Sequence, residues 1–461
     1  MNALQTGWPL YILFTGLGMI SALFIIGWRQ SMRNPRRLAF LFLLFLGMTY
    51  VVRPPLTYLL GGGYEYAELY GIPLDHLPLT GVLVALAFIA FALGYRRNAR
   101  KIEDSELIFR PLGNVTVSLC AFALVAVGYF ARSVAPSEQI ETFAGGSINA
   151  TGLSFVSLAW LLIPAGLLLL YANTGKLLWP VLLGLPFLVI SVRDAYGRYI
   201  FLTLIIGLAS MFLLGQQRTR VKQLTILTIA LGTFYFVFLA IGFDRVGFVE
   251  SGDLSRNIGM LRQEHYYDML GDFAGFEGTI YQVNTIHEEK PDYGTSLIYN
   301  LIIQPIPRII WHNKPLPPEF TWNYILGRNR DSEEYRVGEG MLFYTNQVKG
   351  HVGYALQEFG YPGVALLFLL EGWLLGVVEL WYARSNKGPC EVATYSVCYV
   401  LLIFTGRNTL FDYLSRYVIY FIIPYFAVWF IVLKGKRGAV HGATAGSRGR
   451  MISEKGLVPG R

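Results

Sequence analysis

Five arginines stand within or at one end of strongly apolar segments, where a charged side chain is costly and usually serves a purpose. They are Arg53, Arg193, Arg198, Arg245 and Arg407. A guanidinium group is always charged and binds phosphate through two parallel hydrogen bonds. As a group, these arginines suit the phosphate or pyrophosphate of a lipid-linked substrate. Each one alone is also explained by a structural ion pair, such as Arg193 with Asp194, or by a side chain that reaches the membrane interface.

Acid–base chemistry needs a histidine or a carboxylate, and the sequence offers His351 and Glu358. Both stand where a long polar segment returns to apolar sequence. The spacing of seven residues predicts that they share one helix face, two turns apart. Either could orient or deprotonate an acceptor hydroxyl, although a single histidine is more often structural. His265 is another candidate, and Glu371 is predicted to make a polar contact inside the helix bundle.

A third candidate group lies in the segment 306–315, where Pro307 and Pro315 restrict the backbone. Between them, Arg308 offers a forked phosphate ligand and Lys314 a point charge. Trp311 can stack on a sugar ring or anchor at the membrane interface. Further along the chain, Trp322 is a second candidate for binding sugars. These residues alone do not separate a substrate site from a surface turn with interfacial anchors.

Metal and nucleotide motifs are missing from the sequence. It contains no HExxH, no paired histidines at helical spacing, no Asp-rich loop and no Walker-type phosphate loop. The cysteines, Cys120, Cys390 and Cys398, fall in or beside apolar segments, which argues against a disulfide framework or a cysteine zinc site. The sequence therefore gives no sign of a metal site or a cofactor site, and it argues against ATP hydrolysis.

These residues must be positioned by long apolar segments. The chain has 461 residues, 54% hydrophobic and 15% charged, whereas soluble domains carry about 25% charged residues. Runs of about 20 apolar residues cross a bilayer, and they must be helical to satisfy their backbone groups. The sequence predicts an all-α polytopic membrane protein with about eleven transmembrane helices, between about ten and twelve. Their expected ranges are 8–28, 38–60, 79–95, 112–131, 153–172, 178–190, 199–214, 224–243, 353–381, 392–404 and 413–433.

Positive residues indicate the orientation of these helices. They cluster in every second connection, at 29–37, 96–101, 176, 218–222, 384–387 and in the C-terminal tail. Cytoplasmic connections carry an excess of Lys and Arg. The N-terminus is then outside and the C-terminus is cytoplasmic. The net charge of +8 reflects this topology and not a nucleic-acid partner, and the five arginines above lie near the outer face.

One long polar segment divides the chain. We expect helices one to eight in 1–243, a large extracytoplasmic loop in 244–351, helices nine to eleven in 352–433, and a disordered basic tail in 434–461. The loop is rich in aromatic residues, which favours a folded cap over a disordered linker. Its apolar stretch 296–311 is broken by prolines, so it predicts a helix lying at the membrane surface.

Three motifs resemble those of the bacterial O-antigen polymerases (Wzy-type), within the wider group of oligosaccharide repeat-unit polymerases and O-antigen ligases. They are Pro307-Arg308 with Trp311 and Lys314-Pro315, the segment HVGYALQEFGYPG at 351–363, and Gly406-Arg407 before the last helix. Arg198 is similar to the arginine of a Ser-Arg-Gly type motif, but here the flanking Ser and Gly are missing. Val352 follows His351 where the ligases have Asn, and this departure favours polymerase over ligase.

The resemblance implies metal-independent, inverting glycosyl transfer at the outer face of the bacterial cytoplasmic membrane. A growing glycan would move from undecaprenyl pyrophosphate to an incoming lipid-linked repeat unit. Arg198, Arg308 and Arg407 would lead in stabilising the pyrophosphate as it leaves. The implied partners are the undecaprenyl-pyrophosphate-linked oligosaccharide and membrane lipid. A chain-length regulator protein is a further partner that the resemblance allows. The product would be an O-antigen, an exopolysaccharide or a capsule.

Three other functions stay open at this point. One is an O-antigen ligase, one is a transporter or flippase of lipid-linked sugars, and one is a structural membrane partner. A transporter is expected to show internal repeats and charges near the middle of the membrane. The sequence shows no repeat, and its charged residues gather towards one face.

Overall fold

The computed structural model describes a large part of the chain. The described residues are 2–27, 37–60, 74–102, 107–134, 140–141, 147–148, 159–193, 197–215, 225, 275–286, 291–303, 306, 311, 313, 350–404, 414–415 and 417–433. Within these ranges the protein is helical, apart from one short antiparallel pairing of β1 (Ile140–Glu141) with β2 (Ser147–Ile148). An all-helical architecture is what the apolar segments predict, because only helices and closed barrels satisfy the backbone in lipid.

Among the residues that the structure describes, five helices are long and apolar enough to cross a membrane. Their spans are Gly7–Ile26 in α1 (Asn2–Ile26), Leu38–Tyr58, α5 (Leu77–Ala99), α6 (Val115–Val134) and α17 (His351–Arg384). Shorter apolar helices are η5 with α8 (Ala159–Leu161 and Leu162–Thr174), α9 (Leu178–Arg193), α10 (Gly197–Leu214), α18 (Pro389–Phe404) and the segment Val418–Leu433, which opens with η9 (Val418–Ile422).

These helices fall on predicted ranges, but the predicted total stays untested. The eighth predicted helix, 224–243, and most of the predicted cap, 244–351, lie outside the described residues, as does the tail 434–461. From the cap, the structure describes α14 (Gly275–Thr285), α15 (Thr295–Ile298) and η7 (Tyr299–Ile303). The last two form the first half of the stretch predicted to lie as a helix at the membrane surface.

The second predicted helix, 38–60, contains Arg53-Pro54-Pro55, yet it continues through these residues. It runs through α2 (Leu38–Gly47), η2 (Met48–Val52), α3 (Arg53–Pro55) and η3 (Leu56–Leu60), and both η segments are π-helical. Proline removes an N–H donor and clashes with the carbonyl one turn earlier. Wider π turns on both sides of the prolines accommodate this, and such turns are frequent at functional sites.

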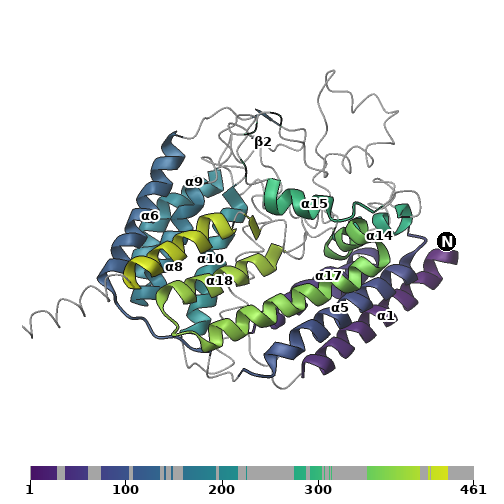
Figure 1. Ribbon diagram of the computed structural model, residues 1–461. Helices are drawn as coiled ribbons and strands as arrows, with labels where there is room; N and C mark the ends of the chain where they lie inside the picture. Colours follow the sequence, from purple (N-terminus) through teal and green to yellow (C-terminus); the bar gives the residue numbers. More distant parts are fainter. Residues whose placement is uncertain are drawn as a thin grey trace, which may run out of the picture.

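Most of the described helices fall into two groups (Figure 1). α1, α5 and the long part of α17 lie side by side, and α6, α8, α9, α10 and α18 form the second group. α5 and α17 approach closely at Gly94 and Gly372, where an added Cβ would meet a backbone carbonyl of the opposite helix. Small residues of this kind let helix backbones pack tightly in apolar bundles.

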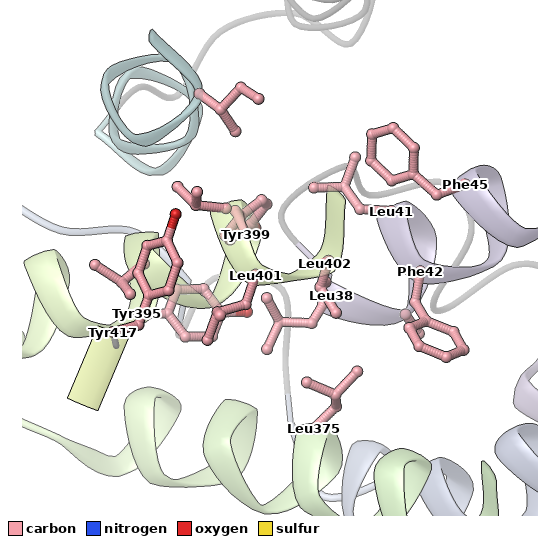
Figure 2. Close-up of a cluster of buried hydrophobic side chains, with 14 of the residues drawn as sticks. Leu38, Leu41, Phe42, Phe45, Leu375, Tyr395, Tyr399, Leu401, Leu402 and Tyr417 are labelled. Carbon is pink, nitrogen blue, oxygen red and sulfur yellow. The ribbon is translucent and has the colours of Figure 1, made fainter. Parts of the chain in front are cut away.

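A hydrophobic cluster joins the two groups (Figure 2). Leu38 and Leu41 of α2 face side chains of α18, including Tyr399 and Leu402, while Leu375 of α17 lies below them. Phe42 of α2 stacks on Phe91 of α5. All of these side chains are buried. The cluster therefore ties α2, α17 and α18 together next to the polar groups described below.

α17 is two helices that meet at Gly360. The backbone there has φ 67° and ψ −162°, a conformation that is essentially confined to glycine. Pro362 follows in the first turn of the next helix, where its missing N–H has no cost. We call 351–359 the short limb and 361–384 the long limb.

The chain reverses at Gly360. His351 and Glu371 are 20 positions apart, so a straight helix would separate them by about 30 Å. Instead, Nε2 of His351 lies 2.6 Å from Oε2 of Glu371. The two limbs therefore fold back on each other. The sequence predicted one continuous helix here, and this part of the prediction is wrong because a single glycine gives no signal in the apolar periodicity.

Candidate functional site

The centre of the candidate site is the contact between His351 and Glu371. Both side chains are fully buried, and the imidazole lies between Phe42, edge-on, and Phe368, at ring-centroid distances of 5.7 Å and 4.5 Å. Nε2 and the carboxylate are at ion-pair distance, although their orientation is not that of a hydrogen bond. Buried charge is costly unless it is paired, and this contact places a carboxylate beside a group that can carry a positive charge.

The N-terminus of the short limb is capped by hydroxyl groups from other helices. The Val352 N–H donates to the Tyr50 hydroxyl, and the Gly353 N–H donates to the Thr279 hydroxyl, each over 3.1 Å. The two hydroxyls are also 3.1 Å apart. First-turn N–H groups need such partners when they are buried. His351 is thus held at a helix start that the protein has built into its interior.

α14 begins beside the short limb. Gly350 has φ 71°, and a Cβ there would collide with the carbonyl of Gly275, the first residue of α14. Gly353 likewise packs against Thr279, one turn further along both helices. Two short helices therefore start side by side, with their positive dipole ends at the level of His351.

Arg53 is held by a carboxylate of α14. Its Nη1 lies 2.6 Å from Oε2 of Glu277, and the Tyr58 hydroxyl donates to Oε1 over 3.3 Å. Arg53 and Glu277 are 7% and 2% exposed. This is the structural ion pair that the sequence left open as an alternative. Pyrophosphate binding by Arg53 stays a prediction, and it would require the phosphate to displace Glu277.

Glu358 lies on the short limb together with His351, and it is fully buried. The expected common helix is therefore present. Beside it, the Gln357 side chain donates to Asp292 over 2.7 Å, and the Asp292 N–H donates to the Gln357 carbonyl over 2.9 Å. The segment that leads into α15 is thus attached to the short limb just before the reversal.

The other predicted site residues are placed only in part. Arg193 ends α9 and Arg198 lies in the first turn of α10, but their side chains are outside the described structure. Trp311 is 39% exposed. The remaining candidates lie outside the described residues, namely Arg245, His265, Arg308, Lys314, Trp322 and Arg407. The structure therefore gives His351 and Arg53 one partner each, Glu371 and Glu277. Phosphate binding by the five arginines stays a prediction.

The sequence missed several of these partners. Tyr50, Glu277 and Thr279 carry no local pattern that sets them apart. Glu371 did carry a signal, because it is a lone carboxylate in the apolar run 364–378. Its predicted contact inside the bundle is confirmed, and His351 is the residue it contacts.

A second buried ion pair lies towards the other end of the long limb. Nη1 of Arg37 is 2.5 Å from Oε1 of Glu379, and Oε2 accepts from the Leu38 N–H and from the Tyr95 hydroxyl. Arg37 also donates to the Ile102 carbonyl. This pair joins the ends of three helices, and both carboxylate oxygens are hydrogen-bonded. It differs in this respect from the His351–Glu371 pair.

The arrangement around His351 can carry out acid–base chemistry. Both ring nitrogens of His351 and both carboxylate oxygens of Glu371 are buried without a hydrogen-bond partner in the described part of the chain, and the contact between Nε2 and Oε2 leaves Nδ1 as the nitrogen away from Glu371. An imidazole held by a carboxylate at one nitrogen can accept or donate a proton at the other. No group of three or more metal-ligating side chains occurs among the residues that the structure describes. Comparisons with protein-family models, curated proteins and solved structures found no match for this chain.

Proposed function

We propose that this protein is a membrane glycosyltransferase that polymerises lipid-linked oligosaccharide repeat units. The supporting observation is the buried His351–Glu371 pair. It stands at the start of the segment 351–363, which resembles the re-entry motif of the O-antigen polymerases. The pair supplies an acid–base group within an apolar helix bundle, where a transfer between two lipid-linked sugars needs one.

The proposed reaction needs no metal. The acceptor hydroxyl gives its proton to His351 or Glu358 while its oxygen attacks the anomeric carbon of the growing glycan. The bond from that carbon to undecaprenyl pyrophosphate breaks, and the electron pair leaves with the pyrophosphate. Arg198, Arg308 and Arg407 stabilise that leaving group, with Arg193, Arg245 and Lys314 as further cationic candidates, while Trp311 and Trp322 hold sugars.

The proposed location is the bacterial cytoplasmic membrane, with the N-terminus outside and the C-terminus inside. One contact supports this orientation. Arg37, Ile102 and Glu379 meet at one end of the bundle, so Arg37 lies towards the same side as the basic clusters 96–101 and 384–387. Such a shared end is expected for the cytoplasmic face.

Reconstitution tests the proposed activity. The purified protein in liposomes receives a synthetic undecaprenyl-pyrophosphate-linked repeat unit, and the products are separated by size. A ladder of repeats supports the polymerase. Transfer to added lipid A identifies a ligase instead, and an unchanged substrate contradicts glycosyl transfer.

Single variants test the predicted pyrophosphate ligands. In a strain that lacks the gene, Arg198→Ala, Arg308→Ala and Arg407→Ala should each abolish long glycan chains while single repeats persist, because the leaving group loses its stabilising charge. Gel analysis of the glycan, with immunoblots for protein level, checks this. Normal chain lengths in all three variants at wild-type protein level would contradict the assignment.

A second candidate function is a transporter of lipid-linked sugars. The observation that favours it is an ionisable pair buried within a membrane-length helix that is broken at Gly360. Intramembrane ionisable residues and broken helices both occur in transporters. In the same liposomes, movement of a labelled lipid-linked sugar across the bilayer without a change in its size would favour transport.

A further inference from the structure

We infer that Glu371 is the positioning residue of the proposed transfer. It holds Nε2 of His351, so Nδ1 is the atom that takes the proton of the acceptor hydroxyl. This inference rests on the proposed glycosyl transfer and deepens it. It chooses His351 over Glu358 as the base, and it gives a role to a carboxylate that lies 20 positions further along the chain.

The first argument is a comparison of the two carboxylates of the long limb. Glu371 and Glu379 are both fully buried, and each faces a cationic or potentially cationic partner. Around Glu379, both carboxylate oxygens accept hydrogen bonds. At the other pair, the structure shows no hydrogen-bond partner in its described residues for either oxygen of Glu371 or either ring nitrogen of His351, and only Nε2 and Oε2 are at ion-pair distance.

This difference in hydrogen bonding distinguishes a structural ion pair, Arg37–Glu379, from a pair that could take part in chemistry, His351–Glu371. Buried polar atoms are nearly always satisfied in proteins, and an exception calls for an explanation. A purely structural pair would be expected to look like Arg37–Glu379. The His351–Glu371 pair instead keeps one nitrogen that is able to receive a proton.

The second argument is that the surroundings fix the imidazole. Phe42 and Phe368 pack against the ring. The adjacent N–H groups of Val352 and Gly353 are already bonded to Tyr50 and Thr279. Those donors therefore do not compete for Glu371. Within the described residues, the polar contact of its carboxylate is with the imidazole.

The proton and electron balance follows from this geometry. Nδ1 takes the hydroxyl proton as the new C–O bond forms and the bond to pyrophosphate breaks. The imidazolium that results is stabilised by the carboxylate at Nε2. Its proton then passes to the departing pyrophosphate, which restores the neutral ring. Both ring nitrogens are buried, so the acceptor must part the surrounding side chains to reach Nδ1.

Five variants test this role in the reconstituted full-length protein. They are His351→Gln, Glu371→Gln, both together, the exchange His351→Glu with Glu371→His, and the control Glu379→Gln. We measure kcat and KM for chain elongation together with thermal unfolding in detergent. The control has the same residue type, helix and burial as Glu371.

We expect Glu371→Gln and His351→Gln each to lower kcat by about 100- to 10,000-fold with KM little changed. The double variant should be no worse than the worse single variant, because the two residues act as one unit. The exchange should restore thermal stability but not kcat, since the carboxylate and imidazole then stand in each other's places. Glu379→Gln should lower the unfolding temperature and leave kcat of the folded protein unchanged.

Two outcomes overturn the inference while the proposed function stands. One is a Glu371→Gln protein whose kcat stays within about twofold of wild type, far from the loss expected of a missing base partner. The other is an exchange variant that recovers kcat together with stability, because a merely structural pair works in either direction. A wild-type protein that forms no ladder overturns the proposed function itself, and with it this role.

Discussion

In the described part of the chain, six buried ionisable residues form three pairs. Arg53 with Glu277, His351 with Glu371 and Arg37 with Glu379 each join segments that are distant in sequence. The sequence marked some of these residues as unusual, because charge in apolar segments is costly. It could not pair them, since pairing depends on which helices become neighbours.

At the residue scale, Arg53→Ala should destabilise the folded protein by about 3–5 kcal/mol, because Glu277 is left as an uncompensated buried charge. Replacing both residues, as Arg53→Met with Glu277→Leu, should recover most of the loss. Thermal or denaturant unfolding in detergent measures both effects. Equal stability of the single variant and wild type would show that the ion pair does not hold α14 in place.

The double variant also tests the predicted phosphate role of Arg53. If Arg53 only anchors Glu277, the stable double variant should elongate glycans at the wild-type rate. A stable double variant that has lost elongation would instead support pyrophosphate binding by Arg53.

Among the elements, α17 departs most from its predicted form. Apolar composition predicted a helix over 353–381, and the structure has one from His351 to Arg384. The reversal at Gly360 adds a buried short limb to what would otherwise be a plain membrane span. The site depends on this reversal, because it is what brings His351 to Glu371.

Gly360→Ala should therefore destabilise the hairpin by about 1–3 kcal/mol, since an L-residue is strained at this φ and ψ. We also expect glycan elongation to fall, because the two limbs would be held less well. Gly16→Ala is the matched control, as an added Cβ there has nothing within 4 Å. Unfolding temperature and elongation rate together check the effect, and an equal response of both variants would contradict it.

At the scale of the whole molecule, the positive clusters predict which ends of the helices face the cytoplasm. The contacts among Arg37, Ile102 and Glu379 bring three of the predicted cytoplasmic ends together. The candidate site lies away from that end. The two carboxylates are eight positions apart on the long limb, which corresponds to about 12 Å along a helix.

Cysteine labelling tests this orientation. The three native cysteines are first replaced by alanine, and single cysteines are then introduced at Tyr293 and at Lys176, which are both exposed. A membrane-impermeant thiol reagent added to intact spheroplasts should label Tyr293→Cys and spare Lys176→Cys, because the first is predicted outside and the second inside. Labelling with the opposite preference would reverse the orientation.

The sequence by itself determined the helical class, the apolar ranges that the described helices occupy, and the residues worth examining for chemistry. These follow from composition, from the length of apolar runs and from the cost of charge in them, which are all local properties. The polar contact of Glu371 inside the bundle was also predicted from the sequence, because Glu371 is a carboxylate within an apolar run.

Only the tertiary structure decided the partners. It paired Arg53 with Glu277 and capped the short limb with Tyr50 and Thr279. It also placed His351 against Glu371 by reversing the chain at Gly360. Each of these contacts joins residues that are far apart in sequence, and no local pattern records how a chain folds back on itself. The physical reason is that the backbone conformation of the reversal costs little free energy at Gly360. Packing of the whole helix bundle then decides that the chain reverses there.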